Sequence, residues 1–241
     1  MPADVQKKPR KFSNGILLIS LLTSLTLLPF LEHLGSNRLL LRFFMTVTIV
    51  AAIFTNRQRH SLRIPILVLA VVSVPVAWIS AFVNSLVLFR AHCVLFVVFF
   101  GVSGSLLILA SFRQRFATLD AVLGAIAAYL LFGLAWAFAY WALAQAAPST
   151  FAWPAEMDVV HEDDEPIRLF PKVVYYSMVT MSTLGYGDIT PVSNIACTLA
   201  WIQSVTGQFY VAVLVAWLVS ALPRPELLED EVLGNQSNGS S

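Results

Sequence analysis

Six long apolar stretches divide this chain of 241 residues. A helix rises only about 1.5 Å per residue, so it needs about 20 apolar residues to cross the hydrocarbon core of a bilayer. The second stretch is the shortest, and its start near Leu39 is the least defined. The pattern predicts an all-α membrane protein with six transmembrane helices. We place them near residues 15–34, 39–55, 64–83, 86–112, 119–145 and 192–222.

The composition favours the same class. Hydrophobic residues make up 58% of the chain, and the mean hydropathy is +0.76. Charged residues make up 12%, about half of their usual share in soluble domains. No segment combines basic and aromatic residues as a nucleic-acid-binding surface does, so we expect no nucleic-acid partner. The sequence also lacks a water-accessible Ser/His/Asp arrangement, zinc-ligand spacing and a phosphate-binding glycine loop. We therefore do not expect an enzyme.

The two cysteines, Cys93 and Cys197, lie inside apolar stretches. Free cysteine is among the most buried residue types, so we expect two buried, unpaired thiols. Their positions indicate neither a disulfide framework nor a metal site. We expect no cofactor.

Lysine and arginine indicate the orientation of the spans, because cytoplasmic loops are enriched in them. If every stretch crosses, ten of the fifteen basic residues lie on one side. These are Lys7, Lys8, Arg10, Lys11, Arg57, Arg59, Arg63, Arg113, Arg115 and Arg224. The sequence thus predicts a multi-pass protein of the cell (inner or plasma) membrane with both termini cytoplasmic. Residues 32–35 offer no small-residue cleavage site, so we expect the first span to be retained.

A shorter apolar segment at 172–182 lies between the last two spans. It is too short to cross, and the turn residues that follow would end it. Such a segment is tolerated at membrane depth only where protein surrounds it. We therefore predict a re-entrant helix.

The hexapeptide TLGYGD, from Thr183 to Asp188, follows this helix. Glycine-rich chemistry of this kind also suits a tight turn. At membrane depth, however, rings of backbone carbonyls can replace the hydration shell of an ion. Gly185 and Gly187 can adopt positive φ without a Cβ clash, which would let successive carbonyls face the same way. The K⁺ ligands would be the Thr183 hydroxyl and the backbone carbonyls of Thr183, Leu184, Gly185 and Tyr186, with Gly187 closing the filter.

In this setting, residues 119–222 resemble the tetrameric potassium channel family, of the prokaryotic type with six transmembrane helices and a two-helix pore module. The resemblance rests on the TLGYGD filter and on the ungapped run PKVVYYSMVTMST from Pro171 to Thr183. It implies that four chains surround one pore. One filter segment per chain cannot encircle an ion, and we find no internal repeat, so we expect a homotetramer.

The resemblance also implies residues that support the filter. The aromatic pair of the family is Tyr175–Tyr176 in this chain, where Tyr176 would support Tyr186 and Tyr175 would bind Asp188. Simple core packing of both tyrosines is the alternative. Some relatives hold the aspartate through a buried glutamate on the pore helix. Val179 occupies that position here, which leaves Tyr175 as the expected partner.

The last span contains three candidates for gating or for the inner cavity. Gly207 lies where relatives have a hinge glycine, although close helix packing is an equally good reason for glycine in a membrane helix. Gln208 follows it, and we expect its amide to face a water-filled cavity. Val211 belongs to an apolar run that could narrow into a constriction closing by dewetting.

These elements predict four segments, which are a cytoplasmic N-terminus at 1–14, a four-helix transmembrane shell at 15–116, a pore domain at 117–222 and a short cytoplasmic tail at 223–241. The shell occupies the position of a voltage sensor but is poor in charge. Its fourth span carries only Arg90 and His92, so we expect weak or absent voltage dependence. The link at 111–120 is short, so we expect each shell to pack against its own pore segment.

The sequence therefore favours a potassium-selective channel that conducts passively in a lipid bilayer. Leu184, where valine is more frequent in relatives, leaves open a less selective cation channel. A non-conducting membrane scaffold or regulatory subunit that keeps the pore pattern is the alternative of a different class.

Overall fold

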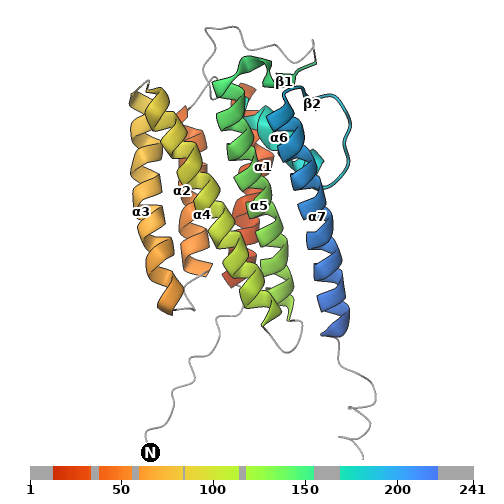
Figure 1. Cartoon of the computed structure of the whole chain (residues 1–241). Coiled ribbons are helices and arrows are strands. Elements are labelled where there is room, and N and C mark those ends of the chain that lie inside the picture. The colour runs from red at the N-terminus through yellow and green to blue at the C-terminus, as the bar shows by residue number, and fades with distance from the viewer. Residues whose placement is uncertain are drawn as a thin grey trace, which may run out of the picture.

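A computed structural model describes residues 13–33, 38–55, 60–83, 85–113, 118–154 and 169–221. These residues form long helices, one short helix, a 3₁₀ turn and a two-stranded pairing (Figure 1). The elements are α1 (Ser13–His33), α2 (Arg38–Thr55), α3 (His60–Phe82), α4 (Leu86–Phe112), α5 (Leu119–Ala146), η2 (Pro148–Thr150), β1 (Phe151–Ala152), α6 (Leu169–Met181), β2 (Thr190–Pro191) and α7 (Asn194–Ser220).

The helices coincide with the six apolar stretches and with the predicted re-entrant segment. The described part of the chain is therefore mostly helical, as expected. Within it, α4, α5 and α7 are long and apolar enough to cross a membrane. Shorter apolar stretches, at 14–28 in α1 and 66–80 in α3, fall below that length. Six crossings therefore remain a prediction. The two predicted cytoplasmic termini lie outside the described residues, except for residues 13 and 14.

The three longest apolar helices each begin at a hydroxyl cap. Ser85, Thr118 and Ser193 have extended backbones, and their side chains accept hydrogen bonds from the amides three residues later, at 3.5, 3.2 and 3.2 Å. Each such cap satisfies an otherwise unpaired amide at the helix start and stabilises the helix by about 1 kcal/mol. The sequence thus sets where these helices begin.

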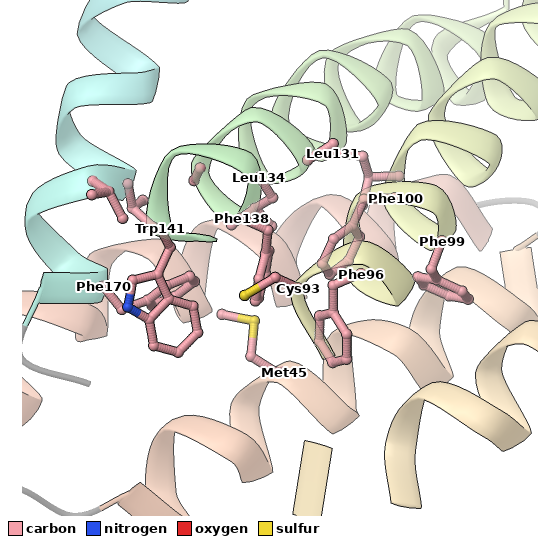
Figure 2. Packing of buried hydrophobic residues seen from close by; sticks show 14 of the residues in the cluster. Met45, Cys93, Phe96, Phe99, Phe100, Leu131, Leu134, Phe138, Trp141 and Phe170 are labelled. Atoms are coloured by element: carbon pink, nitrogen blue, oxygen red, sulfur yellow. The ribbon is translucent and has the colours of Figure 1, made fainter. Parts of the chain in front are cut away.

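A buried cluster rich in aromatic residues joins α2 and α4 to α5 and α6 (Figure 2). Phe138 of α5 lies at its centre, with ring centroids 4.8 Å from Phe96 and 5.8 Å from Phe100 of α4. On its other side Phe138 packs 4.9 Å from Phe170, at the start of α6. Met45 of α2 also belongs to this buried cluster. Continuous packing therefore runs from the outer shell to the short helix.

The helix α1 is tied to the start of α5. The backbone N–H of Asn14 donates to the Asp120 carboxylate at 3.1 Å, and the Asn14 side-chain amide donates to the Asp120 carbonyl at 2.8 Å. The carboxylate thus lies at the positive end of the α1 dipole, where negative charge is stabilising. Within the single chain, α1 and α4 therefore both pack against α5. Packing of the shell on its own chain rather than on a neighbour stays a prediction.

The helix α7 is mostly exposed in the single chain. Figure 1 shows α3 and α7 on opposite sides of the bundle, with α4 and α5 between them. Only Ala196, Gln203 and Gly207 of α7 are buried. Cys93 is buried, as predicted, but the same prediction is wrong for Cys197, which is exposed. The reason is that Cys197 lies on a face of α7 that the described parts of the chain leave exposed.

We expect α1 and α5 to crosslink within one chain. A cysteine pair at Asn14 and Asp120, made in a Cys197→Ser background, should react with a short bis-maleimide and still migrate as one chain on a denaturing gel. Crosslinked species of two or more chains at early times would instead show that α1 packs on a neighbour.

Candidate functional site: the re-entrant helix and the segment 183–188

The helix α6 has 13 residues, a length of about 20 Å, which is too short to cross a bilayer. Leu169 and Phe170, which lie before the predicted start of the helix, belong to it and are buried. Leu169 starts the helix three residues earlier than predicted. The helix is enclosed by contacts with α5 and α7, as a re-entrant element requires.

The C-terminal end of α6 determines the first unusual backbone angle. The amide of Leu184 donates to the carbonyl of Val179 at 3.0 Å, and the amide of Thr183 donates to the carbonyl of Thr180 at 3.1 Å. These bonds form a Schellman motif, which requires a left-handed residue just past the helix end. Thr183 fills that place with φ of 60°. A β-branched residue is strained there by roughly 1–3 kcal/mol.

The backbone beyond Thr183 alternates in sign. Gly185 and Gly187 have φ of 55° and 78°, as predicted, and among the described non-glycine residues Thr183 alone has positive φ. Positive and negative φ thus alternate from residue 183 to 187. Such alternation turns successive peptide planes so that their carbonyls can share one side. Leu184 and Tyr186 expose 58% and 68% of their surface in the single chain.

Tyr175 and Asp188 form the contact that the resemblance implies. The Tyr175 hydroxyl donates to a carboxylate oxygen of Asp188 at 2.6 Å, and the Ile189 amide donates to the other oxygen at 3.0 Å. The hydrogen bond from Tyr175 lowers the pKa of Asp188. The same bond is the largest cause that raises the pKa of Tyr175 to about 12. The pair therefore fastens the segment after residue 187 to α6.

Tyr176 has a different environment from the one expected. Its ring is buried and packs edge-on against Tyr140 and Phe151, with centroids 5.0 and 5.1 Å apart. Within the described part of the single chain, no ring contact joins it to the exposed Tyr186. Support of Tyr186 by Tyr176 therefore stays a prediction for an assembly of chains.

A buried polar network links α5, α6 and α7, and sequence reasoning missed it. The Gln203 amide, which is 0% exposed, donates to the Ser177 carbonyl at 3.0 Å and to the Ser177 hydroxyl at 2.8 Å. Its oxygen accepts from the Tyr140 hydroxyl at 2.8 Å, and Ser177 donates to the Gly133 carbonyl at 2.7 Å. An amide in an apolar span needs hydrogen-bond partners. By this criterion the sequence marks Gln203 as a candidate for a polar contact as clearly as it marks Gln208.

The three inner-helix candidates lie at different places on α7. A Cβ on Gly207 would lie 2.2 Å from the Met181 carbonyl oxygen. Close packing therefore explains this glycine, and α7 is continuous through it. Gln208 is exposed, and its Nε2 donates to the Thr183 hydroxyl at 2.7 Å. Val211 is 47% exposed.

A short strand pairing holds the chain just after the segment 183–188. Phe151 and Ala152 of β1 pair antiparallel with Pro191 and Thr190 of β2. The Val192 amide also donates to the Thr150 carbonyl at 2.8 Å. Both ends of the segment are thus fixed, one by the end of α6 and the other by this pairing.

Residues 125–223 match the model of a protein family described as ion channel. This part of the chain is similar to the ion channel family. The match begins inside α5 and includes α6, the segment 183–188 and α7, and it leaves out α1 to α4. No curated protein matches the chain.

The match supports ion permeation in a lipid membrane, and it suggests a protein that is not an enzyme. The geometry of the matched residues agrees with this role. The negative end of the α6 dipole lies at Thr180–Thr183, where a cation would be stabilised. Among the described residues, no cluster of His, Cys, Asp or Glu could hold a metal ion.

Substitution of Gln203 by leucine should lower the stability of the packing of α5, α6 and α7. It would leave the Tyr140 hydroxyl and the Ser177 groups without their partner in a buried site, at a cost of about 1–3 kcal/mol. We expect a lower melting temperature in detergent. Tyr140→Phe should cost less, and Thr198→Val, which affects an exposed hydroxyl bonded to its own helix, should change little. An unaltered melting temperature of Gln203→Leu would refute the structural importance of the network.

Substitution of Tyr175 by phenylalanine should raise the pKa of Asp188 toward its ordinary value of 3.8. In the unmodified protein the Tyr175–Asp188 hydrogen bond weakens at low pH, as the Asp188 carboxylate is protonated around its lowered pKa. The same bond is lost at high pH, because the Tyr175 hydroxyl loses its proton around its pKa of about 12. The contact should therefore be insensitive to pH between 3.8 and 10.0, the ordinary pKa values of the two groups.

Carbon-13 titration of the Asp188 carboxyl measures the pKa effect directly. Tyr176→Phe keeps Tyr175 and is the matched control, so its Asp188 should titrate as in the unmodified protein. Equal Asp188 pKa values with and without the Tyr175 hydroxyl would show that the contact does not form in solution.

Proposed function

We propose that the protein is a potassium-selective channel that conducts K⁺ passively through a homotetrameric pore. The observation that carries the proposal is the alternating sign of φ over residues 183–187, directly after a helix whose negative end lies at the same place. A dehydrated K⁺ needs several oxygens arranged around it. One chain supplies a single column of carbonyls, so four copies around one axis are required.

The exposure of α7 supports this assembly. It is an apolar helix of 27 residues with only three buried positions. Lipid and neighbouring copies would cover the exposed faces. The exposed side chains of Leu184 and Tyr186 fit the same arrangement, because in a tetramer the filter segments would be surrounded by other chains.

The four-helix shell supports a channel without strong voltage gating. The only basic side chains of α4 are those of Arg90 and His92. His92 is buried beside Phe96, Phe138 and Trp141, with ring centroids 4.6, 5.6 and 5.9 Å away. Moving one charge through 100 mV yields only about 2.3 kcal/mol, so a steep response needs several mobile charges. We propose a structural shell, in a cell membrane with both termini cytoplasmic.

Purified protein in liposomes should show potassium flux, and native mass spectrometry should show four chains. Gly185→Ala should lower the flux at least about tenfold, because alanine at φ of 55° is strained and would turn a carbonyl away. Gly101→Ala is the matched control. A Cβ meets nothing within 4 Å at either position, but Gly101 lies in regular helix far from the filter segment.

Reversal potentials under bi-ionic conditions decide the degree of selectivity. Similar permeabilities of sodium and potassium would favour the less selective cation channel instead. Absence of flux from a well-folded tetramer would favour a scaffold or regulatory subunit.

A further inference from the structure

The side chain of Gln208 reaches a group that would bind the permeant ion. Its Nε2 donates to the Thr183 hydroxyl at 2.7 Å, and this hydroxyl in turn donates to the Ser182 carbonyl at 2.7 Å. Thr183 lies at the end of the filter segment next to α6, which is the inner end of the proposed pore. Gln208 is therefore bonded to the innermost oxygen of the proposed filter.

The two bonds limit what the Thr183 oxygen can still do. A hydroxyl has one hydrogen and two lone pairs. The hydrogen is used toward Ser182, and one lone pair accepts from Gln208. One lone pair remains for a cation, and the amide N–H adds a partial positive charge close to it. The Thr183 hydroxyl is thus a weaker cation ligand than a free one.

Neighbouring residues hold this contact in place. Gly207 lets α7 approach the Met181 carbonyl so closely that no Cβ fits between them. The Schellman motif at the end of α6 turns Thr183 into a left-handed conformation immediately after Met181 and Ser182. Gln208 follows Gly207 directly, so its position relative to Thr183 is set by backbone packing as well as by its own rotamer.

We infer that Gln208 is a positioning residue that lowers the cation affinity of the innermost ring of the filter. The inference rests on the proposed channel function and adds a specific role for α7 in it. Four Gln208 amides would act on four Thr183 hydroxyls. A weakly held innermost ion leaves more readily toward the inner side, so Gln208 controls how strongly cations entering from that side are retained.

Barium applied from the inside tests the inference in membrane patches. Ba²⁺ has nearly the size of K⁺ and twice its charge, so it competes for the same oxygens and blocks where it binds tightly. Gln208→Met keeps the length of the side chain and removes the donor. We expect the half-blocking internal Ba²⁺ concentration to fall at least about fivefold, as the loss of one competing hydrogen bond implies. Block by external Ba²⁺ should change less.

Two further variants separate the hydrogen bond from simpler effects. Gln208→Asn keeps an amide in the cavity but is one methylene too short to reach Thr183, so it should behave like Gln208→Met. It also serves as the test if the methionine variant fails to fold. Thr206→Val removes an exposed hydroxyl of α7 that bonds only its own helix. It should leave Ba²⁺ block unchanged.

The outcomes distinguish this inference from the proposed function. Potassium current with unchanged internal Ba²⁺ block in both Gln208 variants overturns the inference alone. If internal Ba²⁺ blocks Gln208→Asn as it blocks the unmodified protein, the inference is also overturned. General polarity of the side chain would then be enough, without the bond to Thr183. Absence of potassium current in the unmodified protein overturns the channel function and the inference together.

Discussion

The structure depends on one constraint, which is that a non-helical backbone must be held at membrane depth. A bilayer core offers no hydrogen-bond partners, so irregular backbone survives there only where protein or an enclosed aqueous space surrounds it. Residues 183–187 leave helical geometry, with positive φ at every second position. Their carbonyls are free to face an ion only because other parts of the chain fix both ends of the segment. Most of the pore segment serves this requirement.

The support comes from contacts of different kinds. The Gln203 network joins the three helices of the pore segment through fully satisfied buried hydrogen bonds, and such networks specify one arrangement rather than several. Gly207 brings the inner helix against the end of the re-entrant helix. Outside the core, the bond from Tyr175 to Asp188 and the β1–β2 pairing hold the chain after residue 187.

The four N-terminal helices extend this support outward. Their link to the pore segment is mainly apolar and aromatic, through Phe96, Phe100 and Phe138. At the opposite end from the segment 183–188, Phe112 of α4 packs against Trp217 of α7, with ring centroids 5.2 Å apart. The shell therefore contacts the last three helices at two places, one beside the start of α6 and the other near the end of α7.

The sequence alone determined the elements whose cause is local. Apolar runs of sufficient length predicted every long helix, and hydroxyl caps mark where three of them begin. Gly185 and Gly187 indicated positive φ because only glycine adopts it without strain. The Tyr175–Asp188 bond followed from a family pattern with short spacing. Only the tertiary structure showed that Thr183 shares the left-handed conformation, that Gly207 serves packing, that Gln203 is the buried node and that Cys197 is exposed. The Thr183 conformation comes from the Schellman motif at the end of α6, which its β-branched side chain did not indicate. The other three depend on which helix face meets which neighbour, and that meeting joins residues too far apart in the chain for local patterns to specify.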